Sequence, residues 1–245
     1  MKGGKSALLD TLKRQILTLE LQPDHDLDEV QLSATYGISR TPVRDVLRRL
    51  AGEGYVEIRE NRGAHVIPMN HATLRDFFLV APLIYEAIGR LAVQNFRAAQ
   101  MDQLKACQTR FHAAIKAGDP EAMVVQNNAF HSIIGDMAQS AFLQPSFNKL
   151  LIDHARIGHT FFRPRNDAMR TNLATASDHH DQFIAAIGQR EDEVVVRLVH
   201  EHWELSRRDM EMFIAPIGLE SGSMERLSPG LPARKPRAPK AVARA

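Results

Sequence analysis

The amino-acid sequence predicts a mainly α-helical protein in which one small β-hairpin interrupts the helices. Two observations support this fold class. Apolar residues recur at helical spacing through most of residues 6–50 and 72–214. Between these stretches, residues 55–59 and 64–67 form short runs with β-branched or aromatic residues, and the turn between them contains a glycine, as in a hairpin.

The N-terminal domain is expected to span residues 1–70 and to begin with a helix over residues 6–19, where leucine and isoleucine recur at helical spacing. A second, shorter helical pattern ends at Gly37. Ser39 and Thr41 then each offer an N-cap for a third helix. The domain therefore starts with three helices and ends with the hairpin.

The third helix has an apolar face and a basic face. Arg40, Arg44 and Arg48 are spaced by four residues and share one face. A different face is apolar and carries Val43, Val46, Leu47 and Leu50. Two helices joined by a tight turn and followed by a hairpin are typical of a winged helix-turn-helix, whose second helix enters the major groove of DNA.

The expected DNA-contacting residues come from this helix and from the hairpin tip. Arginine can bind guanine in bidentate fashion or clamp phosphate, and hydroxyl groups can donate to phosphate. The expected set is Ser39, Arg40, Thr41, Arg44, Arg48, Arg62, Gly63 and His65. The alternative is an ordinary solvated helix face whose arginines pair with nearby carboxylates. The position of the arginines between a helix-turn signal and a wing favours double-stranded DNA.

The composition is that of an ordinary globular protein, since 44% of the 245 residues are hydrophobic and 24% are charged. The formal net charge is only +2, so the positive charge of the basic helix is local. The single cysteine, Cys107, excludes an internal disulfide and fits a reducing compartment. The sequence has no signal-peptide pattern and no apolar run long enough to span a bilayer, so we expect a cytoplasmic protein with no membrane partner.

Residues 71–215 are expected to form an all-helical bundle domain, because no strand pair interrupts the helical pattern. The expected helices lie near residues 72–95, 99–117, 119–138, 142–162, 167–188 and 191–213. Residues 216–245 are rich in Ser, Pro, Ala, Arg and Lys, and we expect them to be a basic, disordered tail.

Three of these helices each carry a histidine on the apolar face: His131, His180 and His202. Asn127 lies one turn before His131 on the same face. Imidazole is a good ligand for zinc, nickel and other first-row metals, and an amide oxygen can add a weaker ligand. Hydrogen-bonded core histidines would give the same spacing, so the residues alone leave both interpretations open.

The stretch from Gly37 to Val66, GISRTPVRDVLRRLAGEGYVEIRENRGAHV, resembles the DNA-binding signature of the GntR transcription regulators. The resemblance covers about the first seventy residues. It implies that Arg40, Thr41 and Arg44 contact operator DNA and that Gly63 is the glycine of the wing. Val30 occupies a position that often carries a polar or basic DNA-contacting residue in the family, which affects operator details.

The helical domain resembles the FCD ligand-binding domain of the FadR-type branch of that family. The branch has an Asp-x-x-x-His motif followed by two further histidines, and NNAFH, HDQFIAAI and HEHWE match in order and approximate spacing. The resemblance implies a divalent metal ion, zinc or nickel, and a small organic acid effector held against it. The implied metal ligands are Asn127, His131, His180 and His202.

Two departures from the family pattern bear on the effector. Asn127 stands where aspartate is usual, which removes a negative charge but keeps an oxygen ligand. Pro82 stands four residues before Glu86, where an arginine is common, so we expect a different effector or a different pose. Candidates for polar contacts with the effector lie on one expected helix: His154, Arg156 and His159.

The resulting prediction is a metabolite-responsive, DNA-binding transcription regulator and not an enzyme. We expect a homodimer on a near-palindromic operator, acting as a repressor, as is more common in the family. One alternative is a metal-dependent hydrolytic enzyme built on the three histidines, although the sequence has no HExxH motif and no nucleophile elbow. A second alternative is an unregulated DNA-binding protein with structural histidines.

Overall fold

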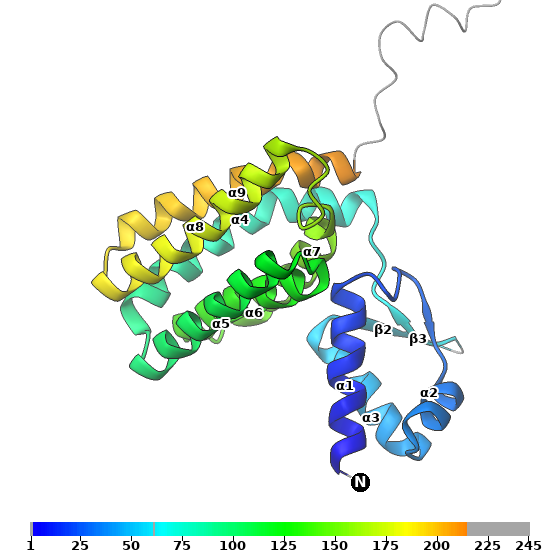
Figure 1. Ribbon diagram of the computed structural model, residues 1–245. Helices are drawn as coiled ribbons and strands as arrows, with labels where there is room; N and C mark the ends of the chain where they lie inside the picture. The colour runs from blue at the N-terminus through cyan, green and yellow to red at the C-terminus, as the bar shows by residue number, and fades with distance from the viewer. Residues whose placement is uncertain (1, 61, 215–245) are drawn as a thin grey trace, which may run out of the picture. The chain divides into compact units, whose positions relative to one another are not determined.

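The computed structural model describes residues 2–60 and 62–214. The tail expected over residues 216–245 lies outside this part of the chain. The described residues form an N-terminal winged helix-turn-helix and a C-terminal helical domain, which confirms the predicted fold class (Figure 1).

The N-terminal domain contains three helices and three short strands. In chain order these are α1 (Lys2–Leu17), β1 (Asp26–Leu27), α2 (Glu29–Tyr36), α3 (Arg40–Glu53), β2 (Val56–Arg59) and β3 (Gly63–Val66). The Asp28 side chain caps α2 by accepting from the backbone N–H groups of Val30 and Gln31. Gly37 ends α2 in the left-handed conformation, with φ of 60°, and so allows the tight turn into α3.

The core of this domain is formed mainly by α1 and α3. The buried apolar residues include Leu8, Leu12 and Ile16 from α1, and Val43, Val46, Leu47 and Leu50 from α3. The predicted apolar stripe of α3 therefore faces α1, and its arginines are left on the outer face.

The wing is a three-stranded antiparallel sheet in the order β1-β3-β2. The hairpin has Val56 opposite Val66 and Arg59 opposite Gly63. The sequence prediction contained only this hairpin and missed β1, in which Asp26 pairs with His65. Two residues are too few for a periodic pattern, so nothing local marks β1 as a strand.

The helical domain contains six α-helices and one 3₁₀ turn among the described residues. They are α4 (His71–Asn95), α5 (Ala98–Ala117), α6 (Pro120–Ala138), α7 (Gln144–Ile157), η1 (Gly158–Thr160), α8 (Asp167–Gln189) and α9 (Asp192–Ile214). These helices lie within a few residues of the predicted ranges. The main difference is that α7 ends at Ile157, where the sequence prediction continued a helix to residue 162.

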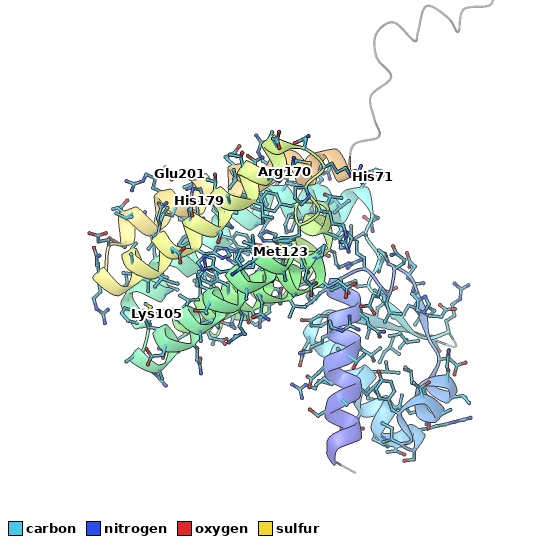
Figure 2. All side chains as sticks on the ribbon, in the orientation of Figure 1. His71, Lys105, Met123, Arg170, His179 and Glu201 are labelled. Atoms are coloured by element: carbon cyan, nitrogen blue, oxygen red, sulfur yellow. The ribbon has the colours of Figure 1, made fainter. Side chains whose placement is uncertain are left out.

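The helices bury a shared core, and side chains fill the space between them (Figure 2). Helix α4 packs against α6, α7 and α9, while α8 packs against α5 and α9. Gly89 allows the close approach of α4 and α9, because a Cβ atom there would lie 3.0 Å from Val195 Cγ1. None of the helices in the described part of the chain is both long and apolar enough to cross a membrane.

Candidate metal centre and nucleic-acid interface

Three histidines from three different helices converge in the helical domain. His131 lies on α6, His180 on α8 and His202 on α9. One ring nitrogen from each lies within 4.8 Å of the other two. The ring centroids of His131 and His180 are 5.3 Å apart, and those of His180 and His202 are 5.1 Å apart. Residues separated by up to 71 positions in the sequence thus form one compact group of nitrogen donors.

Burial keeps these imidazoles neutral. Desolvation lowers the pKa of His131 and of His180 well below the usual range, and it lowers the pKa of His202 to about 3. Neighbouring histidines lower all three further, because one protonated ring would repel the next. A neutral imidazole with a free lone pair is the form that binds a metal ion.

The donor set fits a first-row divalent cation. The Nε2 atoms of His131 and His180 are buried and have no hydrogen-bond partner among the described residues. Leaving a buried polar atom unpaired costs about 1–3 kcal/mol, and a metal ion that accepts both lone pairs removes that cost. Tetrahedral zinc with Zn–N bonds of about 2.1 Å requires nitrogen–nitrogen separations of roughly 3.4 Å. The three nitrogen atoms lie within 4.8 Å of one another, so small side-chain shifts would bring them to this separation.

Gln108 on α5 fixes the orientation of His180. Its Oε1 accepts from His180 Nδ1 at 3.0 Å, and its Nε2 donates to the Ser177 carbonyl at 3.0 Å. The second bond sets the amide orientation, so His180 carries its proton on Nδ1 and keeps its lone pair on Nε2. Gln108 was not among the residues predicted from the sequence, although a glutamine between the apolar residues Leu104 and Phe111 was a usable signal.

Asn127 is buried on α6, one turn before His131. Residues four apart on a helix share a face, so its amide lies on the His131 side of α6. Its assignment as a ligand stays a prediction.

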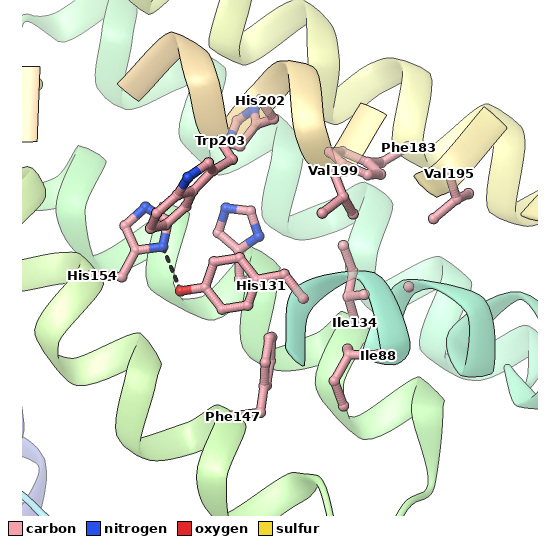
Figure 3. Close-up of a pocket in the computed structure, with 12 residues that line it drawn as sticks. Ile88, His131, Ile134, Phe147, His154, Phe183, Val195, Val199, His202 and Trp203 are labelled. Atoms are coloured by element: carbon pink, nitrogen blue, oxygen red, sulfur yellow. Dashed lines mark hydrogen bonds between the residues drawn. The ribbon is translucent and has the colours of Figure 1, made fainter. Parts of the chain in front are cut away.

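A cavity of about 30 Å³ adjoins the histidine group (Figure 3). Its lining includes the polar residues Tyr85, His131, His154, His202 and Trp203, and the apolar residues Ile88, Gly89, Ile134, Phe147, Phe183, Val195 and Val199. The Tyr85 hydroxyl and His154 Nδ1 form a hydrogen bond of 2.8 Å. Burial lowers the pKa of His154 to about 4, so this pair offers hydrogen bonding without net charge.

Of the three residues expected to contact an effector, only His154 lines this cavity. Arg156 is fully buried and donates to Asp153 at 3.2 Å and to the Ile67 carbonyl at 2.8 Å. His159 pairs with Arg163. Arg156 is two residues from His154 on α7 and points to a different face, and His159 lies beyond the end of α7 in η1. Their contact with an effector stays a prediction.

The residues expected at the DNA interface lie on α3 and on the wing. Arg40, Thr41, Arg44 and Arg48 are exposed on α3, Ser39 precedes it, and Arg62 and Gly63 are exposed on the hairpin. Arg44 Nε donates to Glu29 on α2 at 2.7 Å. Arg40 and Arg48 form no ion pair within the described part of the chain, so both guanidinium groups are available to an anionic partner.

His65 differs from this set. It is only 5% exposed, and its ring lies against the Asp26 carboxylate of β1. His65 is therefore much less accessible than the other residues of the expected set, because β1 covers it. Its contact with DNA stays a prediction. Exposed Gly63, with φ of 77°, still forms the turn of the wing.

A winged helix-turn-helix joined to a helical domain with a buried histidine group defines a class of DNA-binding regulators. Residues 5–66 match the family described as bacterial regulatory proteins, gntR family, and residues 83–205 match the FCD domain. The chain belongs to the gntR family of bacterial regulatory proteins and is a DNA-binding transcription regulator.

Known relatives share most of the chain at low sequence identity. The HTH-type transcriptional repressor RspR of Escherichia coli (strain K12) is 24% identical over 191 residues, which cover 78% of this chain and 82% of the relative. The gluconate operon transcriptional repressor of Bacillus licheniformis is 21% identical over 197 residues, 79% of each chain. The solved structure of E. coli McbR/YncC has a TM-score of 0.66 at 19% identity and covers 86% of this chain and 97% of that chain, which shows a shared fold.

Proposed function

We propose that this protein is an effector-responsive transcriptional repressor that holds a small carboxylate at a divalent metal ion, zinc or nickel. The observation that carries the proposal is the convergence of His131, His180 and His202 beside a largely apolar cavity. The proposal includes Asn127 as a fourth ligand and retains the division of the chain into residues 1–70, 71–215 and 216–245. Two relatives that are named as repressors support the direction of regulation.

In this proposal α3 enters the major groove. Arg40, Arg44 and Arg48 supply base or phosphate contacts, and Arg62 and Gly63 approach the adjacent backbone. Ser39 and Thr41 donate to phosphates from the start of α3. Glu29 orients Arg44, because its carboxylate accepts from Arg44 Nε at 2.7 Å.

The metal, once bound, supplies a positive charge that neutralises the effector carboxylate. The residues of this chain hold and enclose the acid: three imidazoles fix the cation, and Tyr85 and His154 offer neutral hydrogen bonding. Water is largely excluded by the aliphatic and aromatic lining. A hydrolytic enzyme is less well supported, because no carboxylate that could serve as a general base is among the described residues that line the cavity.

The small volume of the cavity supports coupling between effector and DNA binding. A volume of about 30 Å³ accommodates about two water molecules. Even a short acid must therefore move the walls that α4 and α9 contribute. A ligand that needs a different arrangement of helices binds the two arrangements with different affinities, which is the thermodynamic condition for a shift in population.

An operator-release experiment tests the proposed function. Operator binding by the full chain is measured by fluorescence anisotropy with a panel of carboxylic acids, first with added zinc or nickel and then after chelation. We expect one class of acid to weaken operator binding at least tenfold, and only with metal. His200→Ala is the matched control, because His200 is exposed on the same helix as His202. An acid that binds tightly yet leaves operator affinity unchanged contradicts the proposal.

We further propose that two copies associate through α4. Leu79 and Leu83 are one turn apart and are 65% and 69% exposed, and Val80 beside them is 41% exposed. A self-complementary apolar stripe suits the two-fold interface that a near-palindromic operator requires.

Leu83→Glu is expected to raise the dimer dissociation constant by roughly 100-fold or more, because the symmetric interface loses a buried leucine and gains a charge twice. Sedimentation velocity measures this change. Phe142→Glu is the control, since Phe142 is 94% exposed and lies away from α4 in the sequence. Loss of the dimer in both variants, or in neither, contradicts the assignment of this stripe.

A further inference from the structure

We infer that the effector is a carboxylic acid with a single negative charge and a short, apolar body. This inference rests on the proposed function, because it assumes that an acid docks at the metal. It adds the chemical class of the acid, which follows from the walls of the cavity.

The cavity has a polar side and an apolar side. His131, His154, His202 and Trp203 gather on one side, and Ile88, Ile134, Phe183, Val195 and Val199 lie on the other (Figure 3). A carboxylate bound at the histidine group therefore directs the rest of the molecule toward aliphatic and aromatic carbon. Such a surface stabilises hydrocarbon by removing it from water.

The lining can supply full positive charge only at the end of the cavity where the metal would bind. None of its described residues is an arginine or a lysine, so the bound metal is the one source of full positive charge. Pro82, where the sequence analysis noted the absence of an arginine, is not among the lining residues. A second carboxylate at the far end of the acid would lie against the hydrocarbon wall, away from the metal and without a hydrogen-bond donor, which selects against dicarboxylic acids.

Hydroxyl groups on the body of the acid are also disfavoured. Tyr85 and His154, which are hydrogen-bonded to each other at 2.8 Å, can bond the carboxylate, whereas the opposite wall has only hydrocarbon side chains and Gly89. Each additional hydroxyl of a sugar acid would lose its hydrogen bonds to water and find few replacements. The wall thus selects against polyhydroxylated acids as well.

The packing of α4 against α9 limits the length of the body. At Gly89 a Cβ atom would lie 3.0 Å from Val195 Cγ1 and 3.4 Å from Val199 Cγ2, so this wall is closely packed. Aliphatic side chains can shift by small amounts, but each added methylene requires further separation of the helices. A chain of a few carbons is the size that the cavity can admit.

A matched four-carbon series tests the inference. Binding to the zinc-loaded full chain is measured by calorimetry for butyrate, succinate, 2,3,4-trihydroxybutyrate and butyramide, with octanoate as the long homologue. We expect butyrate to bind at least tenfold more tightly than each of the others. Succinate tests the second charge, the trihydroxy acid tests the hydroxyls, and butyramide tests the need for a charge on the metal.

A pair of variants tests whether the wall sets this preference. Val199→Thr replaces a methyl group by a hydroxyl in the lining at nearly constant volume, and we expect it to reduce the preference for butyrate over the trihydroxy acid at least threefold. Val196→Thr makes the same change on α9 at a buried position outside the lining and should leave the preference unchanged. Thermal unfolding of both variants checks that they fold.

The outcomes separate the inference from the proposed function. Equal or tighter binding of succinate, the trihydroxy acid or octanoate overturns the inference and leaves an acid-responsive regulator standing. If butyramide binds as tightly as butyrate, the negative charge of the acid plays no part in binding, and that part of the inference is overturned. If no acid in the series binds to zinc-loaded protein, the inference is overturned, and operator release by the wider acid panel still tests the proposed function independently.

Discussion

His180→Ala is expected to lower the affinity of the protein for zinc or nickel by more than about 100-fold. Loss of an outer-shell partner alone typically costs about 10- to 100-fold in metal affinity, and removal of a ligand should cost more. His180 is fully buried, and its Nε2 has no hydrogen-bond partner among the described residues, so its lone pair is available to a metal ion. Competition with a chromophoric chelator measures the affinity of the full chain directly.

Two substitutions of Gln108 test how its hydrogen bond to His180 affects metal affinity. Gln108→Leu removes the acceptor of His180 Nδ1–H and should lower metal affinity by about 10- to 100-fold. Gln108→Glu keeps an acceptor at the same position and should retain the affinity, as carboxylate–histidine–metal arrangements do. His200→Ala remains the control. Unchanged affinity in His180→Ala would show that the three histidines are ordinary core residues.

Arg40→Ala is expected to weaken operator binding by about 5- to 150-fold, which corresponds to the loss of about 1–3 kcal/mol from one bidentate arginine contact. Arg40 is the first residue of α3, and side chains near the start of a recognition helix reach base edges. It is exposed and makes no ion pair within the described residues, so its removal should leave the fold intact. Anisotropy with operator DNA measures the change.

The salt dependence of binding identifies the kind of contact that Arg40 makes. If it binds phosphate, the slope of log K against log salt falls by about one, and affinity drops for every sequence. If it reads a base, the slope changes little and discrimination at one operator position relaxes. Arg197→Ala is the control, since Arg197 is 63% exposed on α9 of the helical domain. Unchanged affinity and unchanged specificity in Arg40→Ala would remove it from the interface.

The local structure of this protein follows from short-range patterns in its sequence. The stop at Gly37 and the apolar stripe of α3 act within a few residues, and each leaves a local pattern. The six helices of the second domain are predicted for the same reason, because each buries one face that repeats every 3.6 residues. The identities of the three histidines also follow from that pattern, since all lie on apolar faces.

Which of the functional residues contact one another depends on the tertiary structure. Gln108 and His180 are 72 positions apart, and only the packing of α5 against α8 brings them within hydrogen-bond distance. Pairing of β1 with β3 covers His65, and the facing of α7 places His154 in the cavity while Arg156 binds Asp153 and Ile67. Contacts between distant segments depend on how whole helices and strands pack. A shift of one residue in strand register, or a small rotation of a helix, places a different set of side chains at the contact.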